Sequence, residues 1–301
     1  MNFLKRVTQF TPLLLDGATG SELTRRAVDT RLPLWSARAL LSAPAVLHQI
    51  HTDYLRAGAE ILTANTFRTH RRSLAKGGLG DRAAELTRQA VEIARLAIRD
   101  FNPPRESFVA GSLAPLEDCY SPQLVPLQEE CEREHAEMAR HLKEAGVDFI
   151  LVETMNTIRE AAAAIRAARA TGLPVVASFV CRSDGRLLSG ESVAEAVNAV
   201  APLRVLGLLI NCTPAPTIHQ PFAALQAAIK NLVMTSPPLI TGLYANIGHT
   251  DEVAGWTNTE DVSPLEYARL ATEWLKQGAS LVGGCCGTTP AHIAAVRMIM
   301  P

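Results

Sequence analysis

Short apolar runs alternate with helix-like segments along almost the whole chain, and this alternation limits the possible folds more than any other feature. Eight such runs can be recognised, each followed by a segment with helical spacing or composition. Parallel strands joined by crossover helices have this order, and eight units close into a barrel. We predict an α/β protein, a single (β/α)8 TIM barrel that occupies residues 1–301 as one domain. Its predicted strands are residues 13–15, 59–66, 108–112, 149–154, 175–180, 205–211, 239–245 and 279–282.

The segments between these runs have the length and patterning of helices. Between residues 44 and 57, for example, apolar residues recur with a spacing that is typical of one helix face. A doubly wound open sheet is the alternative fold, but no glycine-rich dinucleotide-binding turn follows any predicted strand. The predicted helices are residues 44–57, 82–99, 128–145, 158–170, a helix starting at 191, then 221–232, 264–277 and 291–300.

Charge and composition argue against several classes of partner. The 301 residues carry a formal net charge of −1, and the densest basic cluster (Arg68, Arg71 and Arg72) is short, so nucleic acid is not an expected partner. No apolar run approaches the roughly 18 residues of a membrane span, and residues 1–10 lack the apolar core of a signal peptide. Six cysteines without regular spacing do not resemble a secreted disulfide framework. We expect a cytoplasmic protein without a membrane partner; a homo-oligomer is possible.

Polar residues stand at the ends of several predicted strands. In a barrel these ends meet at one mouth, where this fold carries out its chemistry. A carboxylate such as Glu153 at the end of a hydrophobic strand is costly to bury alone, so it indicates an ion pair or a substrate contact. Asp16 precedes a glycine and is also compatible with a simple turn. The residues expected to face one another are Asp16, Asn65, Thr66, Glu153, Cys212, Asn246, Cys285 and Cys286.

Two adjacent cysteines lie between glycines in the motif Gly-Gly-Cys-Cys-Gly-Thr-Thr-Pro at residues 283–290. Neighbouring side chains of a strand point to opposite faces, so both thiols can face one site only if the backbone leaves the β conformation. Gly284 and Gly287 permit this, because glycine accepts a positive φ angle. A threonine and Pro290 then provide the N-cap and first turn of a helix. The motif predicts a strand, a sharp turn and a helix.

A third cysteine, Cys212, ends another predicted strand just before a proline-rich turn. Three thiolates can bind zinc and leave one coordination position open, which is typical of catalytic zinc. Two alternatives remain at this point. The cysteines can be small buried core residues or a redox-active pair, or they can form a closed structural zinc site with Cys181 as the fourth ligand.

Taken together and in this order, the motifs resemble the homocysteine S-methyltransferase family over nearly the whole chain. The resemblance implies a (β/α)8 barrel and an enzyme that methylates L-homocysteine to methionine. It also implies that Cys212, Cys285 and Cys286 hold zinc and that Asp16 and Glu153 hold the amino group of homocysteine. The residues that carry it are Asp-Gly at 16–17 with Gly20 and Leu23, Leu-Trp-Ser-Ala at 34–37, Ala-Asn-Thr-Phe at 64–67, Glu-Thr at 153–154, Asn-Cys-Thr at 211–213 and Gly-Gly-Cys-Cys-Gly-Thr at 283–288.

Zinc suits this chemistry. A thiol with a pKa of about 8.5 is mostly protonated at neutral pH and is nucleophilic only as the thiolate, and coordination to zinc removes its proton. Asp16 and Glu153 would orient the substrate, which is catalysis by proximity. We predict that Asn246 is a neutral ligand or a contact to the substrate carboxylate, and that Asn65 and Thr66 are further substrate contacts.

The methyl donor is expected to be a cation that aromatic faces attract. Candidate aromatic residues in the predicted mouth loops are Trp35, Phe67, Tyr120 and Trp256. Trp35 matches an aromatic residue that contacts the donor in betaine-using relatives, but Arg68 replaces their tyrosine. A fixed cation there is unfavourable for a cationic donor unless it meets the donor's carboxylate. We therefore expect S-methylmethionine or S-adenosylmethionine; the alternatives are betaine, another methylated ammonium compound, or a separate corrinoid or folate protein.

Overall fold

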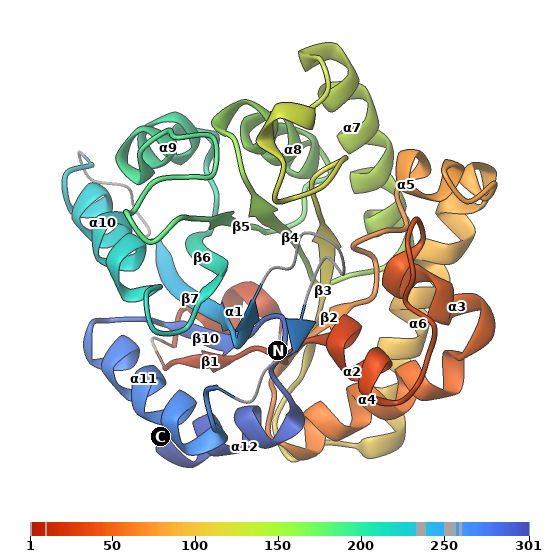
Figure 1. The fold of residues 1–301 in the computed structure, drawn as a ribbon, viewed down its shortest axis with the longest axis horizontal. Helices are drawn as coiled ribbons and strands as arrows, with labels where there is room; N and C mark the ends of the chain where they lie inside the picture. The colour runs from red at the N-terminus through yellow and green to blue at the C-terminus, as the bar shows by residue number, and fades with distance from the viewer. Residues whose placement is uncertain (1, 10, 233–238, 250–256, 259–260, 301) are drawn as a thin grey trace.

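The computed structural model describes residues 2–9, 11–232, 239–249, 257–258 and 261–300. Strands lie at the centre and helices surround them (Figure 1). Eight strands form one sheet in the order β1-β10-β7-β6-β5-β4-β3-β2, and every pairing in it is parallel. The strands are β1 (Leu13–Leu14), β2 (Ile61–Ala64), β3 (Phe108–Leu113), β4 (Phe149–Met155), β5 (Val175–Val180), β6 (Gly207–Pro214), β7 (Ile240–Asn246) and β10 (Leu281–Gly284).

The sheet closes on itself between its first and last strands. Leu15, just after β1, pairs with Ile61 of β2 in a parallel bridge. The backbone amides of Glu60 and Asp16 donate to the carbonyl oxygens of Leu14 and Ile61, at 2.8 and 2.9 Å. Closure leaves no open edge in this eight-stranded sheet. The predicted (β/α)8 barrel is confirmed, and the open doubly wound sheet is excluded.

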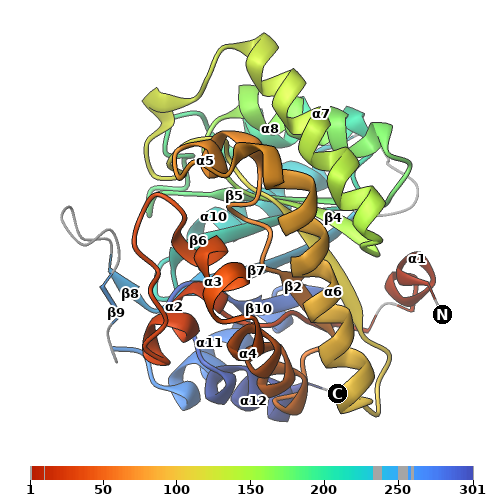
Figure 2. The same cartoon turned by 90° about the vertical axis from the view of Figure 1, so that its right-hand side faces the viewer.

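Amphipathic helices cover the outside of this ring (Figures 1 and 2). In α6 (Ala83–Phe101), the buried residues Leu86, Ala90, Ala94 and Ala97 recur every three or four positions, so they form one stripe that packs on the sheet. No helix among the described ranges has both the length and the apolar run of a membrane span. The other main helices are α4 (Pro44–Arg56), α7 (Gln128–Ala145), α8 (Ile158–Ala170), α9 (Val193–Val200), α10 (His219–Lys230), α11 (Pro264–Lys276) and α12 (Pro290–Ile299).

Several short elements were not predicted, because they are too short to show a periodic pattern. The N-terminal helix α1 (Phe3–Val7) packs under the barrel, where Phe3 stacks on Phe149 at 4.0 Å and meets the edge of Phe108 at 5.4 Å. Both partners begin their strands, so α1 covers the N-terminal end of the barrel and leaves the mouth at the other end. The remaining short elements are α2 (Thr19–Arg25), α3 (Arg38–Ser42), α5 (Arg71–Ala75), the 3-10 turns η1 (Trp35–Ala37), η2 (Gly80–Arg82), η3 (Pro122–Leu124) and η4 (Ala201–Leu203), and the hairpin of β8 (Gly248–His249) and β9 (Thr257–Asn258).

Several predicted boundaries differ from the structure by one to three residues, and two of these differences bear on the site or on a helix cap. Strand β6 continues through Cys212 to Pro214 and does not stop at residue 211. Helix α9 begins at Val193 and not at Glu191, because the Ser192 side chain caps it by accepting a hydrogen bond from the Glu195 amide. Glu191 instead accepts a hydrogen bond from the amide of Ile158, at 2.9 Å, at the start of α8.

Candidate active site

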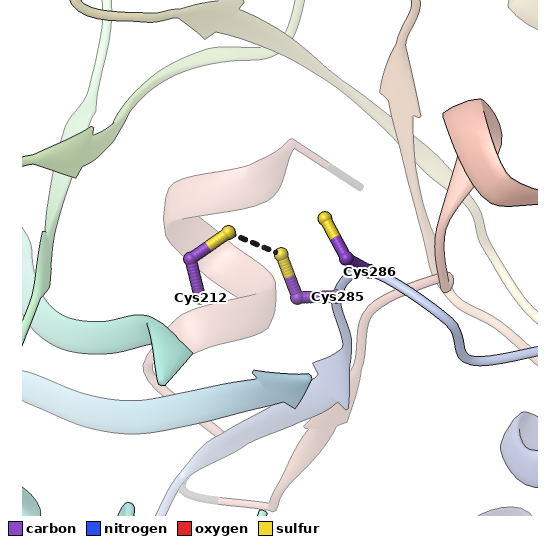
Figure 3. Close-up of side chains that lie close together, drawn as sticks. All are labelled: Cys212, Cys285 and Cys286. Carbon is purple, nitrogen blue, oxygen red and sulfur yellow. Dashed lines mark hydrogen bonds between the residues drawn. The ribbon is translucent and has the colours of Figure 1, made fainter. Parts of the chain in front are cut away.

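Three thiols meet at the carboxyl ends of β6 and β10. Cys212 belongs to β6, and Cys285 and Cys286 follow β10 directly. The Sγ atoms of Cys212 and Cys285 are 2.9 Å apart, and all three Sγ atoms lie within 4.8 Å of one another (Figure 3). The described residues contain no second group of three or more histidine, cysteine or acidic side chains with such a spacing.

A sharp turn after β10 brings the two adjacent thiols to one side. Gly287 has a φ angle of 85°, and a Cβ atom there would overlap the carbonyl oxygen of Ile247, so only glycine fits. The positive φ predicted for Gly284 is absent; that position needs glycine because a Cβ would overlap the side chain of Thr288. The Thr288 hydroxyl donates to the carbonyl oxygen of Cys285 at 2.7 Å and closes the turn, and α12 then begins at Pro290 as predicted.

On β4 and β6, near their carboxyl ends, two non-glycine residues adopt the left-handed conformation. Cys212 has φ of 50° and Thr154, which follows Glu153 on β4, has φ of 61°. Such conformations are costly and occur mainly where the surroundings enforce them at functional sites. These two residues change the direction of the backbone at the ends of β4 and β6. Cys212 thereby reaches the thiol cluster, and the regular pairing of β4 with β5 is interrupted after Val152.

Asn211 ties these two turns together across β5. Its Oδ1 accepts hydrogen bonds from the amide of Thr154 at 3.0 Å and from the Ser178 hydroxyl at 2.7 Å, and its Nδ2 donates to Thr154 Oγ1 at 2.8 Å. Asn211 is fully buried, and every one of these partners is internal. The sequence reasoning missed this role; the available signal was an amide side chain at the end of an otherwise apolar run.

Two carboxyl groups are buried near the thiols. Asp16 follows β1 and is 1% exposed, and Glu153 on β4 is 7% exposed. Asp16 accepts hydrogen bonds from the amide and hydroxyl of Thr63, at 2.8 and 3.0 Å. Glu153 accepts from the Ser112 hydroxyl, and from the Tyr244 hydroxyl at 3.1 Å. Every carboxylate oxygen therefore has a fixed donor, and the two groups are held in place before a substrate binds.

Burial sets the electrostatics of this carboxyl pair. It raises the pKa of Asp16 well above its ordinary value, although the hydrogen bonds from Thr63 lower it. Repulsion by Glu153 raises the pKa further. Burial also raises the pKa of Glu153, against the hydrogen bonds from Ser112 and Tyr244. Two buried groups of like charge favour a cation between them, because it stabilises both ionised forms. The pair is thus suited to an ammonium group.

The thiols also favour a cation. The hydrogen bond with Cys285, followed by burial, holds the pKa of Cys212 well above its ordinary value. The hydrogen bond with Cys212 and burial do the same for Cys286. Three thiolates can coexist in such a cluster only with a compensating positive charge. A soft divalent metal supplies that charge, and sulfur is a donor that zinc prefers, so the donor set fits a zinc ion.

The comparison with known proteins agrees with this chemistry. Residues 13–300 match the family model of homocysteine S-methyltransferase. The chain belongs to the homocysteine S-methyltransferase family. The resemblance noted in the sequence motifs is thereby confirmed.

Relatives of this homocysteine S-methyltransferase family member align over most of its length. Homocysteine S-methyltransferase 2 of Zea mays is 31% identical over 95% of this chain and 88% of its own. Homocysteine S-methyltransferase YbgG of Bacillus subtilis is 30% identical, over 97% and 96% of the two chains. The crystal structure of the homocysteine methyltransferase MmuM from Escherichia coli, in its metallated form, superposes with a TM-score of 0.81 at 28% identity and covers 98% of each chain.

The remaining predicted contacts of this family member fall into two groups. Asn246 ends β7, and its Oδ1 is buried without a hydrogen-bond partner in the described part of the chain, so it is available to a ligand. Asn65 and Thr66 have internal partners: Asn65 Nδ2 donates to the carbonyl of Ser36 and the Thr66 hydroxyl to that of Ser112, both at 2.9 Å. Their direct contact with substrate stays a prediction.

Aromatic residues line the same mouth. Trp35 and Phe67 are half-buried and meet edge to face at 5.7 Å. Tyr120 has a buried hydroxyl with no partner among the described residues, and its pKa is raised well above the ordinary value, first by burial and then by the thiol cluster. Trp256 lies outside the described residues. Cys181 is buried but is not a member of the three-thiol group, so the four-cysteine site is not formed.

Proposed function

We propose that this protein transfers a methyl group from a sulfonium donor, S-methylmethionine or S-adenosylmethionine, to the thiol of L-homocysteine and so forms methionine. The homocysteine thiol first releases its proton to solvent. Its sulfur then forms the new bond to the methyl carbon, the donor's sulfur–methyl bond breaks, and the bonding pair stays with the donor sulfur, which leaves as a neutral thioether. The observation that carries the proposal is the meeting of three thiols and two buried carboxyl groups at one barrel mouth in a member of this family.

Cys212, Cys285 and Cys286 would hold zinc, and the unpartnered Oδ1 of Asn246 is the candidate for a neutral fourth ligand or for a substrate contact. Bound zinc supplies the positive charge that keeps thiols deprotonated at neutral pH. All three protein ligands would be soft thiolates. A metal that prefers such ligands also binds the sulfur of a thiol substrate.

Asp16 and Glu153 would bind the substrate's ammonium group. Their hydroxyl and amide donors on Thr63, Ser112 and Tyr244 hold the carboxylate oxygens in one arrangement. Fixing the ammonium group directs the homocysteine side chain, and thus its thiol, toward the cysteines. Such positioning lowers the entropic cost of reaching the reacting geometry.

A donor panel tests the proposal. The purified, zinc-reconstituted protein is incubated with homocysteine and S-methylmethionine, S-adenosylmethionine, betaine or methylcobalamin, and methionine is quantified. We expect methionine from one or both sulfonium donors. A zinc-loaded protein that forms methionine with none of the four donors would refute the methyl transfer. A protein that retains no zinc but cycles between dithiol and disulfide would support the redox alternative. The cytoplasmic location and self-association stay predictions.

A further inference from the structure

Arg68, on the turn after β2, differs from the other arginines beside it. Arg71 donates to Glu137 at 2.9 Å, and Arg72 donates to Glu134 at 2.7 Å. Arg68 is half-buried, and its Nε is buried without a hydrogen-bond partner in the described ranges. Leaving a buried donor unpaired is costly, and such groups in native proteins call for an explanation. The position is therefore suited to an acceptor that comes from outside the chain.

Arg68 ends a row of side chains along the mouth. Its guanidinium carbon lies over the ring of Phe67, 5.6 Å from the centroid, and Phe67 in turn meets Trp35 edge to face. The Trp35 indole packs over Gly20, where a Cβ atom would overlap it, on the helix that follows the Asp16 loop. We call Trp35, Phe67 and Arg68 the aromatic–arginine row.

Hydrogen bonds connect this row to the buried carboxyl groups of the mouth. Thr66, which precedes Phe67, donates its hydroxyl to the carbonyl oxygen of Ser112 at 2.9 Å, and the Ser112 hydroxyl donates to Glu153. In the loop of residues 114–127, the Tyr120 hydroxyl is buried without a hydrogen-bond partner in the described ranges. Asn156 Nδ2 donates to the carbonyl of Cys119 at 2.9 Å and fixes this part of the loop to the end of β4.

We propose that Arg68 binds the carboxylate of the methyl donor, an inference that rests on the methyl transfer proposed above. The faces of Trp35 and Phe67 attract the donor's cationic centre, and the planar guanidinium can pair with a carboxylate through two parallel hydrogen bonds. A donor without a carboxylate meets only the repulsion of Arg68. The row therefore favours donors that carry a carboxylate beside the cationic centre over donors that are simple cations, with attraction for the carboxylate and repulsion for an unaccompanied positive charge.

The test compares S-methylmethionine with its methyl ester, which keeps the sulfonium and ammonium groups but has no carboxylate. In the zinc-loaded wild type, we expect the ester to have a KM about 10- to 100-fold higher, the loss expected for one charge-assisted bidentate contact. Arg68→Gln should raise the KM for S-methylmethionine by a similar factor and abolish the difference between the two compounds. Arg68→Lys should restore part of the affinity, since lysine keeps the charge without the planar fork.

Arg71→Gln is the matched control, because Arg71 lies three residues away and is already paired with Glu137 and Asp81. It should leave the KM for S-methylmethionine unchanged. In every variant the KM for homocysteine should stay within about twofold, which also shows that the mouth is folded. An increase in the homocysteine KM of Arg68→Gln would assign Arg68 to the acceptor and overturn the proposal. Equal losses for the donor and its ester would overturn it as well.

Failure of the proposed function gives a different result. If the wild type forms no methionine from any donor, methyl transfer is rejected. Calorimetric binding of S-methylmethionine to the wild type and to Arg68→Gln then still tests the arginine alone. Binding that is about 10- to 100-fold weaker in the variant supports the carboxylate contact, and equal binding, or none to either protein, refutes it.

Discussion

Replacing Glu153 by glutamine should weaken homocysteine binding and at the same time stabilise the substrate-free protein. Glu153 is 7% exposed and accepts hydrogen bonds from the hydroxyls of Ser112 and Tyr244. A hydroxyl can donate or accept, so both partners can also satisfy the glutamine amide. The substitution therefore removes the negative charge and keeps the local hydrogen bonds, which isolates the electrostatic role.

The magnitude follows from the buried carboxyl pair. Removing one partner of a buried ion pair costs about 3–5 kcal/mol, and each 1.4 kcal/mol, roughly, is tenfold in Kd. Asp16 remains to share the ammonium group, so we expect a value near the lower end of this range. The Kd for homocysteine should rise about 100-fold, while the bound zinc stays at the wild-type level.

The stability effect has the opposite sign and depends on pH. Burial raises the pKa of Glu153 above that in the unfolded chain. The free energy of unfolding is therefore highest when Glu153 is neutral, at pH values below the pKa of the unfolded chain, about 4.3. It falls as the pH rises through the pKa of Glu153 in the folded protein, because the buried group must then carry a charge. Without substrate, Glu153→Gln should have a higher Tm than the wild type at pH 7, and the difference should shrink as pH falls toward about 4.

Calorimetric titration of the zinc-loaded protein measures the Kd, and thermal unfolding without substrate measures the Tm at each pH. Glu60→Gln is the control, because Glu60 is equally buried but lies at the opposite end of the barrel, where it binds Arg6 at 2.9 Å. It should lower the Tm and leave the Kd unchanged. A homocysteine Kd within about twofold of wild type in Glu153→Gln would remove Glu153 from ammonium binding.

Three further substitutions test the frame of the site. Cys212→Ser should lose most of the bound zinc on dialysis, because a hydroxyl is a poorer ligand than a thiolate; full zinc content by atomic absorption would contradict the three-thiol site. Asn211→Ala removes the hydrogen bonds to Thr154 and should lower the free energy of unfolding, measured by urea titration, by about 2–4 kcal/mol. An unchanged value would show that Asn211 does not hold these turns. Gly287→Ala should cost at least about 1–3 kcal/mol, because φ is 85° and the new Cβ meets Ile247; a wild-type Tm would refute this account of the turn.

Much of the barrel could be predicted because its signals are local. Strand and helix patterning depends on residues within one or two turns of each other, and the end of an apolar run marks the mouth of a barrel once the fold class is known. Asp16, Glu153 and Cys212 could therefore be assigned to one end of the molecule from the sequence. The short helices α1, α2, α3 and α5 could not be predicted, because one or two turns have too few residues to show a period.

The sequence by itself determined the strand–helix alternation, the motif order that indicates the family, and which polar residues stand at strand ends. Only the tertiary structure decided which of them touch. Cys212 and Cys285 are 73 residues apart and meet because β7 alone separates their strands. The left-handed turns held by Asn211, the contact with Ile247 that requires glycine at 287, and the unpartnered Nε of Arg68 are also invisible in the sequence. Each depends on distances between separate segments, which exist only after the ring has closed.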